Sequence, residues 1–195
     1  MRKVKLQMQM TINGYVGGLN GENAWMTFNP DDEYMKFLNS NFDSSDTILL
    51  GRKAAEGFIN YWQNTFDKNP DTPLAKKIVD TPKVVFTKTL DKSTWNNTTL
   101  AKGDLTEEIA NLKKSRPASD GSGSKDILVL GGGGFVSSLI KEGLIDEYHL
   151  IVNPTAIGNG MTIFNSLDRI QKFSPVQAKL YTGGKIVLSY KPNND

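Results

Sequence analysis

A run of four glycines constrains this chain more than any other segment. The apolar stretch Asp126–Leu130 (DILVL) leads into Gly131–Gly134, and the helix-periodic stretch Phe135–Glu142 follows directly. Glycine has no Cβ, so such a run can adopt positive φ and lets a ligand approach the backbone closely. A helix that begins there directs its unpaired N–H groups and the positive end of its dipole at the run. The segment therefore predicts a strand–loop–helix unit that holds a pyrophosphate.

The run matches neither of the common phosphate-binding signatures. No Lys-Ser/Thr pair follows Gly134, as a Walker loop requires, and Phe135 and Val136 stand where the dinucleotide fingerprint has its last glycine. A tight strand-to-helix turn without a ligand is the alternative. That alternative explains the length of the run less well, because one or two glycines are enough for a turn.

Two other predicted strands end in residues that suit a phosphate. These residues are Gly51, Arg52 and Lys53 after one strand, and Thr87 and Lys88 after the other. Cations at a helix start suit an additional phosphate, such as the 2′-phosphate that distinguishes NADP from NAD. Solvated helix charge is the alternative for Arg52 and Lys53. Open α/β sheets bind ligands at the carboxyl ends of their strands, so one bound nucleotide accounts for all three strand ends.

Strand-like and helix-like segments alternate along the chain. The predicted strands are Val4–Thr11, Asp46–Leu50, Lys83–Thr87, Thr98–Leu100, Asp126–Leu130 and Asp146–Val152. The predicted helices are Asp31–Phe42, Arg52–Tyr61, Pro73–Val79, Leu105–Lys114 and Phe135–Glu142, and the polar loops are Asn64–Thr72 and Ser115–Lys125. Two further runs, Val176–Thr182 and Lys185–Lys191, flank Gly183-Gly184 and predict a hairpin with a two-residue loop. We therefore expect a single α/β domain, residues 1–195, whose mostly parallel sheet has an antiparallel C-terminal edge.

Composition excludes several kinds of chemistry. The 195 residues can bury a core of their own, and they include 0 Cys and 1 His. Disulfides, thiolate nucleophiles and zinc fingers are therefore excluded, and we expect no metal site. With 23 basic and 21 acidic residues, there is no electrostatic reason to expect a nucleic acid or a membrane as partner. Neither a signal peptide nor a membrane helix is recognisable, so we expect a cytoplasmic protein.

Several short motifs, in their order and spacing, resemble one superfamily over nearly the whole chain. They are Gln9–Gly17, Leu49–Phe58, Lys83–Leu90, Gly131–Gly134, Gly143–Pro154 and Gly158–Gly160. This series resembles the dihydrofolate reductase-like superfamily. Within it, the series is most similar to stand-alone relatives of the reductase domain of the bacterial riboflavin-biosynthesis deaminase–reductase. The resemblance implies a three-layer fold with a mixed sheet of about eight strands. It also implies an NADPH-dependent reductase that acts on a small heterocyclic substrate.

The resemblance also implies which residues bind the cofactor. Gly51, Arg52 and Lys53 would face its phosphates, Thr87 and Lys88 would flank the adenosine, and Gly132, Gly133, Gly134, Phe135 and Val136 would hold the pyrophosphate and nearby ribose. The loop Asn13–Asn20 would cover the nicotinamide. Many relatives have Thr where this chain has Ala54, a difference that would weaken cofactor affinity. Relatives are often dimers, so we expect a homodimer whose interface uses apolar residues near the C-terminal strands.

The sequence leaves three alternatives for what the protein does. The first is reduction of 5-amino-6-(5-phosphoribosylamino)uracil, as in riboflavin synthesis, although the chain has no cysteines for the zinc site of the deaminase half. The second is a true dihydrofolate reductase, in which Asp32 would be the catalytic carboxylate of the first helix; acids are also common there because they complement the helix dipole. The third is a nucleotide-binding sensor without turnover. We expect the lone His149, within a strand, to be structural.

Overall fold

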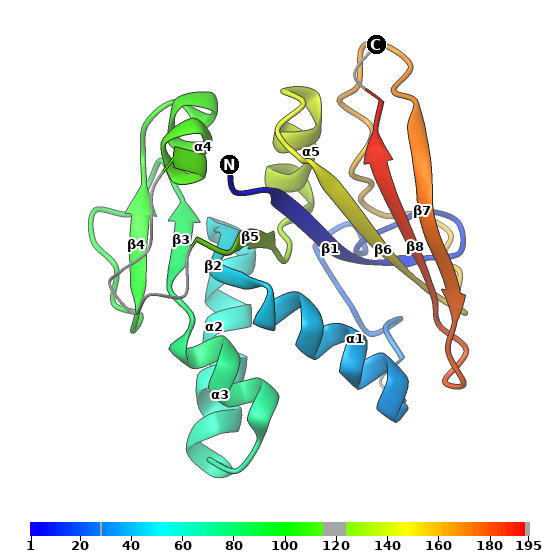
Figure 1. The fold of residues 1–195 in the computed structure, drawn as a ribbon, viewed down its shortest axis with the longest axis horizontal. Coiled ribbons are helices and arrows are strands. Elements are labelled where there is room, and N and C mark those ends of the chain that lie inside the picture. Colours follow the sequence, from blue (N-terminus) through cyan, green and yellow to red (C-terminus); the bar gives the residue numbers. More distant parts are fainter. Residues whose placement is uncertain (28, 115–123, 194–195) are drawn as a thin grey trace.

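Eight strands form one mixed sheet in the computed structural model, which describes residues 1–27, 29–114 and 124–193. The strands are β1 (Val4–Thr11), β2 (Ser45–Gly51), β3 (Lys83–Phe86), β4 (Thr98–Ala101), β5 (Asp126–Val129), β6 (Glu147–Asn153), β7 (Phe173–Leu180) and β8 (Ile186–Pro192). Their order is β4-β3-β2-β5-β1-β6-β8-β7 (Figure 1). The first six pair in parallel, and β8 runs antiparallel between β6 and β7.

Helices cover both faces of the sheet and give the three layers that the sequence predicts. They are α1 (Asp32–Asp43), α2 (Arg52–Lys68), α3 (Pro73–Asp80), α4 (Leu105–Lys114) and α5 (Gly133–Lys141). In Figure 1 the first three occupy the lower half and the last two the upper half. Each group buries its own apolar cluster against the sheet, because the buried side chains of β2, β5 and β6 alternate between the two faces.

The central strand β1 shows this alternation most clearly. Val4, Leu6, Met8 and Met10 are buried in the cluster beneath α5, whereas the intervening residues face α1. The strand pairs with β5 on one side and β6 on the other. The carboxyl ends of these three parallel strands therefore meet at one edge of the sheet.

Several predicted boundaries differ from those in the structure, and three of the differences bear on the site or on the C-terminal hairpin. Helix α2 continues to Lys68, so residues 64–68, expected to belong to a loop, complete the helix. Helix α5 begins at Gly133, two residues early, because the glycines themselves form its first turn. The hairpin turn spans Tyr181–Lys185 and is closed by a hydrogen bond from the Tyr181 amide to the Lys185 carbonyl. Of the predicted loop Ser115–Lys125, residues 115–123 lie outside the described residues.

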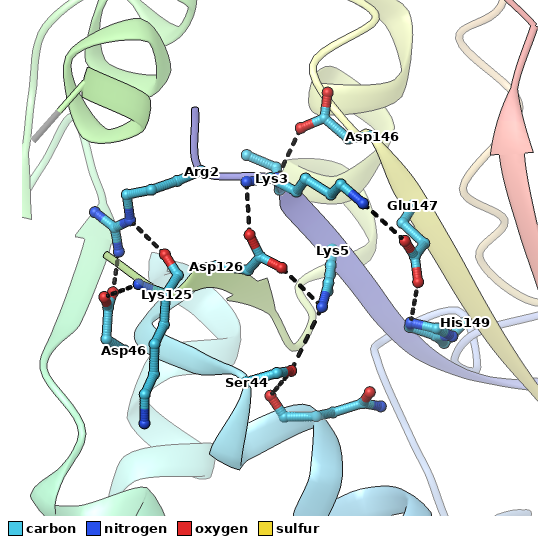
Figure 2. A network of polar contacts seen from close by, with 12 residues as sticks. Arg2, Lys3, Lys5, Ser44, Asp46, Lys125, Asp126, Asp146, Glu147 and His149 are labelled. Atoms are coloured by element: carbon cyan, nitrogen blue, oxygen red, sulfur yellow. Dashed lines mark hydrogen bonds and ion pairs between the residues drawn. The ribbon is translucent and has the colours of Figure 1, made fainter. Parts of the chain in front are cut away.

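A polar network ties together the amino ends of the strands, at the edge opposite the glycine run (Figure 2). The buried Arg2 side chain pairs with Asp46 and donates to Thr47 and to the Leu112 and Lys125 carbonyls. Lys5 pairs with Asp126 at 2.8 Å. These contacts join the amino ends of β1, β2 and β5 to one another and to α4.

His149, in the middle of β6, belongs to the same polar network through Glu147. Its Nδ1 lies 2.9 Å from Ser189 Oγ, and its Nε2 lies 3.2 Å from Glu147 Oε1. Burial is the main cause that lowers the pKa of His149. The histidine is a buried, hydrogen-bonded part of the sheet.

No helix among the described residues is long and apolar enough to cross a membrane.

Candidate nucleotide-binding site

Two helices begin side by side at the carboxyl edge of the sheet. Helix α2 follows β2 directly, and α5 follows the neighbouring strand β5 after the glycine run. A Cβ added at Gly132 would lie 3.5 Å from both Gly51 Cα and Ala54 Cβ. The first turns of the two helices are therefore in contact, so two of the three strand ends that the sequence indicates form one site.

Neither helix supplies its own N-terminal cap. The N-cap residues are Gly51 and Gly132, and no side chain of the described residues accepts a hydrogen bond from the first N–H groups of α2 or α5. Helix α1, by contrast, has an Asp31 cap followed by two acids, and α4 has acids in its first turn. Four N–H groups at each helix start need an acceptor, and the dipoles favour an anion. The paired starts of α2 and α5 leave that requirement unmet by side chains.

Cationic side chains increase the positive charge at this site. Arg52 is half-buried and Lys53 is exposed in the first turn of α2. A cation at a helix start opposes the dipole, so the position is unfavourable unless an anion is bound nearby. No carboxylate in the described ranges forms an ion pair with either residue. The site therefore has the charge and donors that a phosphate group requires.

The glycine run presents backbone rather than side chains to this site. Gly131 and Gly132 have φ of 138° and 87°, values that residues with a Cβ rarely adopt. The N–H groups of Gly133, Gly134 and Phe135 stand at the start of α5, where no intrahelical acceptor is available. The Val136 N–H instead donates to the Gly132 carbonyl at 2.9 Å, and its side chain is fully buried. Val136 therefore contributes packing, and the three preceding residues contribute donors.

Phe135 fixes the two helix starts against each other. Its ring stacks on Phe86, the last residue of β3, with 4.9 Å between ring centroids. A Cβ at Gly51 would lie only 2.6 Å from Phe135 Cβ. Glycine at position 51 therefore lets α5 approach the junction of β2 and α2 closely.

Thr87 and Lys88 follow β3 at the same edge. Thr87 is buried, and its Oγ1 accepts from the Thr89 and Leu90 amides, both at 3.1 Å. Lys88 is exposed. Thr87 thus shapes the turn after β3, and Lys88 is an exposed cation at the same edge of the sheet.

The loop Asn13–Asn20 lies against the start of α5. The Val16 amide donates to the Met161 carbonyl at 2.8 Å, and the Met161 amide donates to the Gly17 carbonyl at the same distance. A Cβ at Gly133 would lie 3.3 Å from Val16 Cγ2. The loop is therefore next to the glycine run, and its role as a cover for the nicotinamide stays a prediction. Met161 lies 28 residues beyond Gly133, and no local sequence pattern indicated that it would contact this loop.

Two neighbouring carboxylates at the start of α1 have different environments. Asp31 accepts from the Tyr34 amide, the Thr182 hydroxyl and the Gly183 amide, and these hydrogen bonds lower its pKa to about 2. Asp32 is exposed, and no hydrogen bond or ion pair joins it to another described residue. The catalytic role of Asp32 stays a prediction. Among the described residues, no three His, Asp or Glu side chains are placed to hold a metal ion.

The strand order, the layers and the paired helix starts define a class. They are those of the dihydrofolate reductase-like fold, the class to which reductases of riboflavin synthesis belong. The chain belongs to the RibD C-terminal domain family, whose model matches residues 2–187.

Two relatives from Bacillus subtilis (strain 168) align over nearly the whole chain. The protein YyaP is 28% identical over 192 residues, which are 98% of this chain and 96% of YyaP. The protein YwjB is 24% identical, over 97% of each chain. Both are described as uncharacterized proteins.

Three solved structures share the fold at low sequence identity. A protein from Shewanella sp. PV-4 assigned to riboflavin biosynthesis has a TM-score of 0.67 at 20% identity, with 100% of both chains covered. A deaminase/5-amino-6-(5-phosphoribosylamino)uracil reductase from Thermotoga maritima has a TM-score of 0.63 at 15% identity; the match covers 98% of this chain and 57% of that enzyme. A pyrimidine reductase-like protein from Corynebacterium diphtheriae has a TM-score of 0.61 at 15% identity, over 100% and 93% of the two chains.

Proposed function

We propose that this protein is a cytoplasmic, NADPH-dependent reductase. The observation that carries the proposal is the pair of contacting helix starts, both without side-chain caps and both without acids, beside Arg52 and Lys53. This arrangement suits a dinucleotide, which has a pyrophosphate and a further ribose phosphate. A bound NADPH supplies the hydride, so the protein need only bind, orient and exclude water.

The residues divide the binding task among them. The amides of Gly133, Gly134 and Phe135 and those at the start of α2 would hold the pyrophosphate, because each has an N–H without an intrahelical acceptor. Arg52 and Lys53 would hold the 2′-phosphate, with Lys88 on the adenosine side. The Asn13–Asn20 loop would shield the nicotinamide. Ala54, which contacts the glycine run, provides no hydroxyl for the phosphates.

For the substrate we propose a ribosylaminopyrimidine or a related small heterocycle. Family membership and the reductase descriptions of the Thermotoga and Corynebacterium proteins support this class. Pyrimidine reduction requires no deaminase half within the same chain. The structure provides no zinc chemistry for deamination, since the sequence has 0 Cys.

Cofactor titration followed by turnover tests the proposal. NADPH and NADH are titrated separately by fluorescence, and the loss of NADPH absorbance is then followed with 5-amino-6-(5-phosphoribosylamino)uracil and with dihydrofolate. We expect sub-millimolar NADPH binding and turnover of the pyrimidine. Absence of dinucleotide binding would refute the reductase. Turnover of dihydrofolate that disappears in Asp32→Asn would assign the protein to true dihydrofolate reductases. Binding without turnover would favour a sensor.

We also propose that the protein forms a homodimer through the outer strands. Leu180 and Ile186 are paired neighbours on one face of β7 and β8, and they are 69% and 39% exposed. Val176 on β7 is 52% exposed as well. A sheet face that meets water normally carries polar residues, so these side chains indicate a covered surface. Sedimentation of the wild type and of Leu180→Glu tests this, and a wild type that sediments as a monomer would refute it.

A further inference from the structure

A buried lysine in the hairpin turn has only neutral acceptors around it. Lys185 is 3% exposed, and its Nζ donates to Asn153 Oδ1 and Thr27 Oγ1, both at 2.8 Å, and to the Thr27 carbonyl. In the part of the chain that the structure describes, no carboxylate pairs with it. Burying an ammonium group is costly, so its three hydrogen bonds must hold their acceptors firmly.

The ammonium group sets the direction of a chain of side-chain hydrogen bonds. It can only donate, so Asn153 must present its oxygen to Lys185 and its amide nitrogen elsewhere. Asn153 Nδ2 donates to Gln9 Oε1 at 2.7 Å, and Gln9 Nε2 donates to the Tyr34 hydroxyl at 2.9 Å. Hydrogen bonds aligned in this way polarise one another. One cation therefore orients groups on β6, β1 and α1 together.

Lys185 also holds the segment that leads into α1. We name this segment the strap and define it as residues 25–27 and 29–31. Its alternate residues contact the end of β6 or the hairpin turn: the Trp25 carbonyl accepts from Thr155, Thr27 bonds Lys185 and Asn153, the Asn29 carbonyl lies against Gly183, and Asp31 accepts from Thr182. Lys185 and Asn153 provide the central contact of the strap.

The strap lies at the same sheet edge as the candidate nucleotide site. Asn153 is the register partner of Thr11, the last residue of β1, and β1 pairs on its other side with β5, which leads into the glycine run. Two strand spacings separate β6 from β5, which is about 10 Å. Asn153 and the glycine run therefore lie at the same edge of the sheet, on opposite sides of β1.

We propose that Lys185 is a positioning residue for the substrate side of this site, where it fixes the strap and the amides of Asn153 and Gln9. The proposal rests on the proposed function for the existence of a substrate. The hydrogen bonds by which Lys185 holds Thr27 and Asn153, which we call the clamp, do not depend on the proposed function. Lys185 acts through Thr27 and Asn153 and contributes nothing to the phosphate site on α2 and α5.

Hydrogen–deuterium exchange without cofactor tests the clamp. Lys185→Met keeps the apolar stem and removes the three donors, so peptides reporting on the strap should exchange about tenfold faster. Lys191→Met is the matched control, because Lys191 is an exposed lysine on the adjoining strand β8. The strap of this variant should exchange as in the wild type. Unchanged strap exchange in folded Lys185→Met would overturn the proposal.

Kinetics separate positioning from general destabilisation. With an acceptor that the wild type reduces, Lys185→Met should lower kcat/KM about tenfold and change the NADPH dissociation constant less than about twofold. If kcat/KM and the affinity for NADPH fell by the same factor, a specific positioning role for Lys185 would be overturned. If Lys185→Met does not fold, Thr27→Val removes one acceptor from the strap side and should likewise accelerate strap exchange; unchanged exchange there counts against the clamp. A wild type that binds no NADPH would refute the proposed function alone, since the exchange comparison needs no cofactor.

Discussion

Replacing Gly51 by alanine tests the close contact between the two helix starts. The new Cβ would lie 2.6 Å from Phe135 Cβ and 3.2 Å from its Cγ. The backbone of Gly51 has φ −77° and ψ 146°, which alanine adopts without strain, so the effect comes from the contact alone. Phe135 cannot move away freely because its ring stacks on Phe86. Helix α5 must therefore shift away from α2.

The expected cost follows from overpacking. Forcing one additional carbon into a packed contact destabilises a protein by about 1–3 kcal/mol. For a domain of this size, each kcal/mol changes the melting temperature by about 2–4 °C, so Gly51→Ala should melt about 2–12 °C below the wild type. A shifted α5 also misplaces the amides of Gly133 and Gly134. NADPH should therefore raise the melting temperature of Gly51→Ala less than that of the wild type.

Gly57→Ala provides the control, because it makes the same change inside helix α2, which begins directly after Gly51. A Cβ at Gly57 would have no neighbour within 4 Å. Alanine inside a helix is better than glycine by about 0.5–1 kcal/mol, so this variant should melt about 1–4 °C above the wild type. Both melts are followed by circular dichroism with and without NADPH. Equal stability of Gly51→Ala and the wild type would refute the contact between the helix starts.

Three further predictions concern single side chains. Arg52→Ala should weaken NADPH binding about tenfold and NADH binding much less, and equal losses by fluorescence titration would remove Arg52 from the 2′-phosphate. Burial lowers the pKa of His149 below 6.5, so the unfolded chain takes up this proton first as the pH falls, and the stability present above about pH 6.5 is lost. Between about pH 7.5 and about pH 5.5, the free energy of unfolding measured in urea should therefore fall less for His149→Gln than for the wild type. Arg2→Met should destabilise by about 3–5 kcal/mol in urea, since it leaves Asp46 without its buried partner, whereas Lys3→Met should change stability by less than about 0.5 kcal/mol.

The sequence allowed most elements to be recognised because their apolar periods are local. Leu105–Lys114 coincides with α4, and β1 has the predicted bounds. The end of α2 was missed because Asn64 and Asp67 suggested a loop. Phe58, Trp62 and Phe66 recur at intervals of four and continue the apolar face of the helix. That spacing was the available signal for a helix ending at Lys68.

The site could be predicted only in separate parts. Each strand end was recognisable by its own residues, but the contact between Gly51 and Gly132 depends on β2 lying beside β5. No local pattern encodes that pairing, because the strands are about 80 residues apart. The Lys185 cluster was missed for the same reason, since Gln9 and Thr27 come from distant segments. One local feature indicated this cluster: Lys185 has the same position in the strand alternation as Val187 and Ser189, whose side chains are buried.

The central position of β1 has a consequence for synthesis on the ribosome. The hydrogen bonds at its start, from the Lys3 and Val4 amides, reach partners 123 and 142 residues later in the chain. At about 5–20 residues per second, the strand emerges about 6–28 s before those partners are made. During that interval Leu6, Met8 and Met10 have no sheet to enter, and contacts of such sequence separation form slowly. The nascent chain should therefore depend on chaperones that bind apolar segments until β5 and β6 have emerged.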